Sequence, residues 1–303
     1  MSFSSTTIKD LRERTGAGML DCKKALEETS GDIEKAIDYL RTKGLAKAAK
    51  KAERAATEGV VSCLVSPDKK SGFIMEVNSE TDFVAKNDKF QTLIQSLTSH
   101  GLQQKTNDLE SFKNSKMGSK TVHDCIQDVI ATIGENITLR RITYLNDPEG
   151  YMGSYIHMGG AVGTLVHLKF QKLNPNTLET IAKDVCMHTA ATAPRYLNRT
   201  SVDTTDLNRE KEVLKQEVLA SGKPPAMVDK IVGGKISKFY TDFCLLEQEF
   251  IKDPDLNVEA FVNKTAMEAG GKAEVKNFVY YKKGEGLQKK EENFADEVAK
   301  MTR

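Results

Sequence analysis

Residues 73–90 read FIMEVNSETDFVAKNDKF, and this stretch decides the fold because a strand pattern changes into a helix pattern within it. Apolar side chains alternate over residues 73–77, as they do in a half-buried strand. They recur at helical spacing over residues 90–97, and we expect Gly101 to end that helix. Phe83 lies at the junction. It is either a core residue or an exposed probe, and the local pattern leaves both interpretations open.

The same order of elements occurs twice along the chain. A polar turn, PDKKSG, separates two strand-like runs and predicts a hairpin, which helices and a strand follow. The first set comprises a hairpin at 60–77, helices at 87–100 and 122–134, and a strand at 137–144. The second comprises a hairpin at 151–170, a helix at 178–185 and a strand at 275–281. Two units of this kind predict a duplicated α+β core.

Three short helical patterns precede the first hairpin. Thr7 begins a stretch that resembles a capping box, Gly16 ends the first helix, Asp32 caps the third and Gly44 closes it. We therefore expect a three-helix bundle at the N-terminus. Residues 45–54 are rich in alanine and lysine, which predicts a helical, solvated connector.

Two further helical features lie in the second half of the chain. Residues 203–243 carry helical patterns on both sides of Ser221-Gly222-Lys223-Pro224-Pro225, which predicts a protruding antiparallel helical hairpin. Its expected apolar seam comprises Val213, Leu214, Val218 and Leu219 facing Met227, Val228, Ile231 and Ile236. A final amphipathic helix carries Phe294, Val298 and Met301.

Composition limits the classes of function. The chain has 303 residues, with 44 Lys and Arg against 43 Asp and Glu, so it lacks the basic field that drives direct nucleic-acid binding. We find neither an apolar signal core nor a run of about 20 apolar residues, and we expect no membrane partner and a cytoplasmic location of bacterial type. An organellar protein whose transit peptide has been removed is the alternative. Five scattered cysteines without a C-x-x-C pair favour small buried side chains over disulfides or zinc.

Known catalytic motifs are absent from the sequence. It contains no phosphate-binding G-x-x-x-x-G-K-[ST] loop, no G-x-G-x-x-G fingerprint, no H-E-x-x-H and no G-x-S-x-G. The five histidines have no metal-ligand spacing. We therefore predict no catalytic residue, no metal site and no cofactor. An enzyme with an unusual site is the alternative that these patterns do not support.

Two long segments together resemble the elongation factor Ts family, whose members are guanine-nucleotide exchange factors for the GTPase elongation factor Tu. One is IKDLRERTGAGMLDCKKALEETSGDIEKAIDYLRTKG at residues 8–44, and the other is the opening stretch, residues 73–90. Shorter similarities are IGENITLRR at 133–141, GSYIHMGGAVGTLV at 153–166 and SGKPP at 221–225. The resemblance covers nearly all of residues 7–300.

The resemblance implies a fold and a division into parts. It implies an α+β protein with a ubiquitin-associated-like (UBA-like) three-helix domain and linker at 1–54, followed by two related core subdomains at 55–148 and 149–285. The helical hairpin at 203–243 is an insertion in the second subdomain, and residues 286–303 form a C-terminal helical module. This division matches the organisation inferred from the patterns.

The resemblance also implies which residues meet the partner. In the family, the TDFV element enters the nucleotide domain of the GTPase and helps to dislodge its Mg²⁺ ion. Carried over, this element is Thr81, Asp82, Phe83 and Val84. Further contacts implied by position are Arg12, Met19, Leu20 and His157. Leu20 replaces a methionine found in many members, and MGGAVG after His157 departs from the more basic segment often found there.

The resemblance implies an exchange factor without covalent chemistry, which binds elongation factor Tu in its GDP-bound and nucleotide-free forms. A homodimer and a 2:2 complex with the GTPase are the assemblies left open. An adaptor is the competing class of function, because GDIEKAIDYL resembles the last helix of ubiquitin-associated domains. Asp82 likewise has two interpretations, as a group that disturbs the Mg²⁺ shell or as the cap of the helix that follows.

Overall fold

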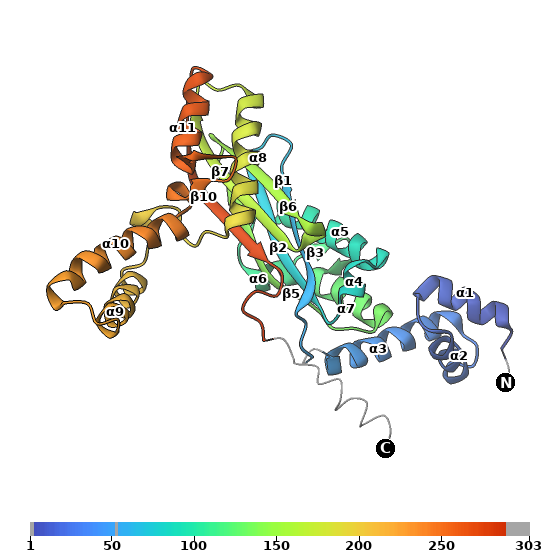
Figure 1. Ribbon diagram of the computed structural model, residues 1–303. Coiled ribbons are helices and arrows are strands. Elements are labelled where there is room, and N and C mark those ends of the chain that lie inside the picture. Colours follow the sequence, from blue (N-terminus) through green and yellow to red (C-terminus); the bar gives the residue numbers. More distant parts are fainter. Residues whose placement is uncertain (1–2, 52–53, 289–303) are drawn as a thin grey trace.

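Two three-stranded antiparallel sheets form the centre of the molecule, and helices cover their outer faces (Figure 1). This computed structural model describes residues 3–51 and 54–288. The predicted C-terminal helix with Phe294, Val298 and Met301 lies outside the described residues. Mixed helices and sheets confirm the α+β class.

The three N-terminal helices enclose a small core of their own. They are α1 (Ser5–Thr15), α2 (Met19–Glu28) and α3 (Ile33–Lys51). Leu11, Cys22 and Leu26 are fully buried among them. The first helix begins earlier than predicted, because the Ser4 hydroxyl accepts a hydrogen bond from the N–H of Thr7 and makes Ser4 the N-cap.

Helix α3 does not close at Gly44, so the predicted helix end there was wrong. A Cβ atom at Gly44 would lie 2.8 Å from the Cβ of Ala131 in α7 (Val122–Ile133). The glycine therefore permits close approach of two helices instead of ending one. The predicted connector is helical up to Lys51, whose ammonium donates to the carbonyl of Gly134 just after α7.

The first sheet has the strand order β1-β2-β5. Its strands are β1 (Glu58–Val65), β2 (Ser71–Ser79) and β5 (Ile137–Asn146). Between β2 and β5 lie α4 (Asp82–Ala85), α5 (Asp88–Gln104), α6 (Leu109–Asn114), β3 (Lys116–Met117), β4 (Lys120–Thr121) and α7. Apolar residues of the helices pack on Phe73, Met75 and Val77 of β2.

Helix α5 continues past Gly101, where it was expected to end. Gly101 is buried against the ring of Phe73, and a Cβ atom there would overlap that ring. The helix instead ends at Gln104, with Lys105 in the left-handed conformation. Gly101, like Gly44, therefore marks a packing contact.

The second sheet has the order β10-β7-β6 and repeats the arrangement of the first, since a hairpin again pairs through its second strand with a later strand. Its strands are β6 (Gly150–His157), β7 (Val162–Gln171) and β10 (Lys272–Lys282). Helices α8 (Pro175–Thr192) and α11 (Val258–Glu268) pack on this sheet. The short elements are η1 (Met158–Gly160), η2 (Arg199–Ser201), η3 (Leu245–Glu247), β8 (Glu249–Phe250) and β9 (Asp253–Asn257).

The two sheets share a core between their inner faces. Ile74 of β2 packs there with Met152, Leu165 and Tyr281 of the second sheet. As a result β2 is buried on both faces from Gly72 to Ser79, so the prediction of a half-buried strand was wrong. The molecule thus has four layers, in the order helices, first sheet, second sheet, helices. The second sheet, and not solvent, covers the inner face of β2.

A buried carboxylate joins β2 to the end of β10. Glu76 is 0% exposed and accepts bonds from Arg140 at 3.0 Å and from Arg141 at 2.6 Å. The N–H of Gly284 donates to the same carboxylate at 2.7 Å. Burial on its own raises the pKa of Glu76, but these donors and the Asn78 amide outweigh it, so the pKa lies below its ordinary value.

A helical hairpin projects from the second sheet in Figure 1 and consists of α9 (Thr204–Ala220) and α10 (Pro225–Phe243). Val218, Val228 and Ile236 are buried along it. Three members of the predicted seam are exposed instead: Val213, Leu219 and Met227. The seam is therefore narrower than the apolar pattern indicated.

Candidate functional site

The TDFV element forms a single turn of helix between β2 and α5. Thr81 is the N-cap of α4, and the Asn87 side chain caps α5 with bonds to the N–H groups of Lys89 and Phe90, so α4 ends after four residues. Phe83 is 77% exposed, whereas Val84 is 3% exposed and belongs to the core under the first sheet. Phe83 is therefore not a core residue. Its neighbour Val84 is the residue of this turn that lies in the core.

Thr81 occupies the N-cap position of α4, but its side chain bonds to a distant residue instead of to the N–H groups of its own helix. Its N–H donates to Glu135 Oε2 at 3.0 Å and its hydroxyl donates to Glu135 Oε1 at 2.9 Å. The Ser79 hydroxyl donates to the Thr81 carbonyl at 2.9 Å. The backbone that leads into α4 is therefore bonded on both sides.

Asp82 is the first residue of α4 and does not cap α5, so the capping interpretation was wrong. Its carboxylate lies 3.6 Å from the Lys86 ammonium, one helical turn on, and its side chain is 55% exposed. An ion pair this exposed contributes little to stability. Asp82 therefore remains accessible next to Phe83.

The N-terminal residues of interest lie on the outside of their helices. Arg12 of α1 is exposed, and Leu20 of α2 is 83% exposed. Met19, also on α2, is 43% exposed. The loop between α1 and α2 reaches the start of α5, because a Cβ atom at Gly16 would collide with the ammonium of Lys89. This loop therefore lies beside the first turn of α5, the helix that follows α4 in the chain.

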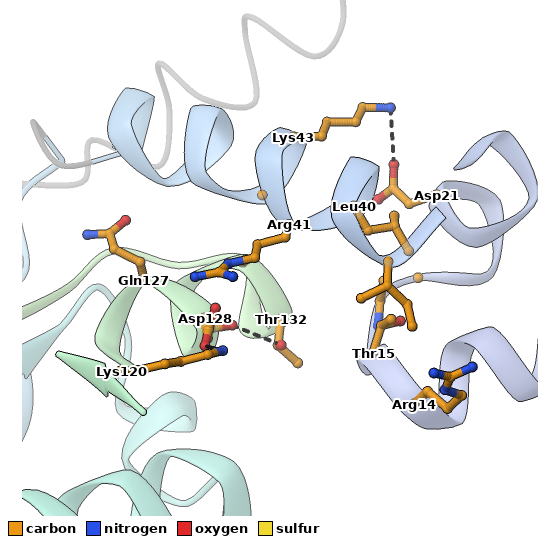
Figure 2. A pocket seen from close by; sticks show the side chains of 15 residues that line it. Arg14, Thr15, Asp21, Leu40, Arg41, Lys43, Lys120, Gln127, Asp128 and Thr132 are labelled. Atoms are coloured by element: carbon orange, nitrogen blue, oxygen red, sulfur yellow. Dashed lines mark hydrogen bonds and ion pairs between the residues drawn. The ribbon is translucent and has the colours of Figure 1, made fainter. Parts of the chain in front are cut away.

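A charged cavity separates the N-terminal helices from α7 (Figure 2). Its volume is about 270 Å³. Lys43 pairs with Asp21 at 3.7 Å on the N-terminal side, and Lys120 pairs with Asp128 on the core side. Each pair lies within one wall, and the basic side chains of Arg14 and Arg41 also line the cavity.

His157 is the exposed last residue of β6, and its Nδ1 lies 3.1 Å from the hydroxyl of Tyr155. Met158 follows with φ 48° and is 78% exposed, which makes it a prominent apolar side chain that the sequence reasoning missed. Gly160 packs against Val60 of β1, where an added Cβ atom would lie 3.0 Å from the Val60 Cβ, and α4 also contacts β1. Strand β1 therefore brings this loop and α4 together.

Glu135 is the second residue that sequence reasoning passed over. It belongs to the IGENITLRR stretch, but only the structure brings it to Thr81. The available signal was that Glu135 is a charged residue just after a predicted helix end. Nothing in the sequence indicated that its partner is Thr81.

Burial raises the pKa of all five thiols, that of Cys63 to about 12, which agrees with cysteines acting as small apolar side chains. Across the described part of the chain, His, Cys, Asp and Glu side chains do not gather in groups of three or more that could hold a metal ion. Within residues 3–51 and 54–288, no helix combines the length and apolarity needed to cross a membrane.

Comparison with known proteins gives a consistent result. The family model described as Elongation factor TS matches residues 80–285. The chain is 46% identical to "Elongation factor Ts" of Trichlorobacter lovleyi, over 99% of this chain and 98% of that protein. It is 46% identical to the protein of that name from Clostridium acetobutylicum and 45% identical to one from Clostridium botulinum, in each case over 99% of this chain and at least 98% of the relative. The chain therefore belongs to the elongation factor Ts family.

Proposed function

We propose that this chain is a guanine-nucleotide exchange factor that binds elongation factor Tu·GDP, displaces Mg²⁺ and promotes release of GDP so that GTP can bind. The observation that carries the proposal is Phe83, which is 77% exposed on an anchored turn of helix in a chain of this family. A large exposed aromatic side chain on a fixed support is suited to insertion into a partner.

The proposed mechanism follows from linkage and involves no covalent step. If the factor binds the nucleotide-free GTPase more tightly than the GDP-bound form, it must weaken GDP binding by the same ratio. Mg²⁺ compensates phosphate charge, so displacement of its ligands weakens the hold on GDP. The energy for that displacement comes from contacts made only in the complex.

In this proposal Phe83 is the wedge and Asp82 its companion. Full burial of an apolar side chain of this size contributes about 1.5 to 3 kcal/mol, enough to offset part of the cost of opening the nucleotide site. Asp82 brings an accessible carboxylate that competes for Mg²⁺ or for its water shell. Thr81 and Val84 act here as supports for α4, since Thr81 bonds to Glu135 and Val84 is buried.

We assign the remaining contacts to two further surfaces. Arg12, Met19 and Leu20 provide one, on the N-terminal helices, and His157 at the end of β6 provides the other. The proposed division is a UBA-like domain with its linker at 1–54, core subdomains at 55–148 and 149–285 with the hairpin at 203–243, and a C-terminal module at 286–303. Its first two boundaries fall outside the sheets, before β1 and between β5 and β6.

The test is release of a fluorescent GDP analogue from purified elongation factor Tu, with and without the full chain, in excess unlabelled nucleotide. We expect the chain to accelerate release in proportion to its concentration until the GTPase is saturated. Light scattering of the complex would distinguish a 1:1 assembly from a homodimer-based 2:2 assembly. Unchanged release at saturating chain would overturn the proposal.

A further inference from the structure

We propose that Glu135 is a positioning residue for exchange, and that it holds the turn of helix bearing Phe83 in the orientation the partner meets. The inference rests on the proposed function, because it assigns a further residue to the same site. It concerns a carboxylate 54 positions away from Thr81 in sequence, on the turn between α7 and β5.

The first observation is that the Glu135 carboxylate accepts hydrogen bonds from both donors of Thr81, its N–H and its hydroxyl. The N–H lies 3.0 Å from Oε2, and the hydroxyl lies 2.9 Å from Oε1 and 3.0 Å from Oε2. A threonine at an N-cap usually turns its oxygen toward the N–H groups of its own helix. Here no such cap bond forms, so the side chain of Thr81 is committed to Glu135. Bonds to a carboxylate are stronger than bonds between neutral groups.

The second observation is a reciprocal bond between the neighbouring residues. Glu80 Oε1 accepts the N–H of Asn136 at 2.6 Å, so a glutamate from each segment holds the backbone of the other. Arg54 extends the arrangement, since its guanidinium lies 3.6 Å from Glu80 and its carbonyl accepts the amide of Asn136 at 2.8 Å. Residues 80–81 are thereby joined to residues 135–136 from both sides.

The third observation is how little else holds α4. A helix of four residues has no stability of its own; Val84 is its one fully buried side chain, and Ala85 packs partly buried against the same core. Its last carbonyls are held by Asn87, whose N–H lies 2.9 Å from the Val84 carbonyl, and by the Gln91 amide at 2.5 Å from the Ala85 carbonyl. The bonds that Glu135 accepts supply the matching constraint at the start of α4.

A preformed wedge and a loosely held one differ in a measurable way. If α4 is already oriented, the full binding free energy of the Phe83 contacts is available to open the nucleotide site of the partner. If α4 is not oriented, part of that free energy is used to order the turn first. Loss of Glu135 should therefore reduce the rate of GDP release at saturation more than it weakens binding. A residue that only stabilises the fold would lower the melting temperature without this separation.

The exchange experiment compares Glu135→Ala, Glu135→Gln and a matched control, Asp124→Asn, in the full chain. Asp124 is also a hydrogen-bonded carboxylate, in the first turn of α7, but its bonds go to Thr121 in the capping box of that helix. We expect Glu135→Ala to lower the saturating release rate about tenfold, with less than about threefold change in affinity for nucleotide-free GTPase. Glu135→Gln keeps one carbonyl acceptor and should recover part of the rate, and Asp124→Asn should leave it within about twofold.

A second measurement needs no partner. The chain contains eight tyrosines but no tryptophan, so Phe83→Trp places on α4 a single tryptophan that can be excited selectively. We expect Glu135→Ala in this background to increase the fast, local component of its fluorescence anisotropy decay, and Asp124→Asn to leave it unchanged. Thr81→Val removes the hydroxyl without changing the shape of the side chain, and should reproduce part of the effect of Glu135→Ala.

The outcomes separate the two proposals. If the unmodified chain does not accelerate GDP release, the proposed function fails, and the anisotropy data still decide whether Glu135 orders α4. If it does accelerate release but Glu135→Ala keeps the full rate and an unchanged anisotropy decay, the positioning role alone is overturned. Equal losses of rate and affinity, matched by a fall in melting temperature and by Asp124→Asn, would also overturn it.

Discussion

Phe83 and Val84 are consecutive in α4, yet Phe83 faces solvent at 77% exposed and Val84 faces the core at 3% exposed. A single turn of helix therefore presents an aromatic side chain to solvent while its neighbour holds the turn to the core. Substitution of Phe83 therefore changes the exposed side chain without changing the core, and substitution of Val84 changes the core contact without changing the exposed side chain.

We predict opposite effects from truncating these neighbours. Phe83→Ala should leave the melting temperature nearly unchanged and slow GDP release at least about tenfold, because it removes a contact made with the partner. Val84→Ala should lower the free energy of unfolding by about 2 kcal/mol, since it empties part of the core. Met267→Ala on α11 truncates another exposed side chain, at 73%, and should affect neither quantity. Normal exchange by Phe83→Ala would contradict the wedge role.

Leu20→Glu should weaken binding to elongation factor Tu more than it slows release at saturation. Leu20 is 83% exposed on α2, so a charge there costs little in the free chain but would be buried in the proposed contact. We expect at least about a tenfold loss of affinity, measured by titration of nucleotide-free GTPase. Leu219→Glu, at a 41% exposed position of α9, is the comparison, and equal losses from both variants would count against a specific N-terminal surface.

Gly101→Ala should destabilise the fold although alanine favours helices. Its Cβ atom would overlap the buried ring of Phe73, and the resulting shift should cost about 1 to 3 kcal/mol in urea unfolding. Gly233→Ala is the matched control, because Gly233 lies within α10 and nothing lies within 4 Å of its added Cβ. The free energy of unfolding of Gly233→Ala should rise by about 0.5 to 1 kcal/mol. A neutral Gly101→Ala would show that Phe73 can move aside.

Glu76→Gln should lower the free energy of unfolding by about 2 to 3 kcal/mol, because it removes the charge that two partly buried arginines share. The carboxylate also accepts the N–H of Gly284, so hydrogen exchange at that amide should increase. Glu274→Gln breaks an exposed pair with Lys276 and should cost less than about 0.5 kcal/mol. Similar costs for both variants would be inconsistent with a buried network.

Asp147 should make stability depend on pH below its ordinary pKa of 3.8. Hydrogen bonding from Lys169 is the largest cause, and bonds from Glu149 N–H and from His167 add to it, so the pKa of Asp147 falls to about 2. The native state therefore releases this proton more readily than the unfolded chain, and the stabilisation is present above pH 3.8 and lost as the pH falls to about 2.

Asp147→Asn should accordingly be less stable than the unmodified chain at about pH 7, and the difference should shrink between about pH 4 and pH 2 in thermal unfolding. Glu149→Gln, whose partner is also Lys169 but whose side chain is 87% exposed, should show a much smaller difference. A difference that grew as the pH fell would contradict a lowered pKa at Asp147.

Much of the fold followed from local patterns. Alternation and helical spacing are properties of neighbouring residues, so the N-terminal helices, both hairpins, the closing strands and the helical hairpin were expected near where they occur. The motifs at 8–44 and 73–90 carried the resemblance that the comparisons confirmed. For the site, the sequence alone determined where the TDFV element lies and left Phe83 between core and surface.

Tertiary structure decided what depends on residues distant in the chain. Gly44 and Gly101 resemble helix ends in the sequence, because a glycine that ends a helix and one that admits a neighbour look alike until Ala131 and Phe73 are in place. Strand β2 became buried on both faces only when the second sheet covered it. The bonds between Thr81 and Glu135 arise in the same way, because hydrogen bonding depends on positions in space that local periodicity does not record.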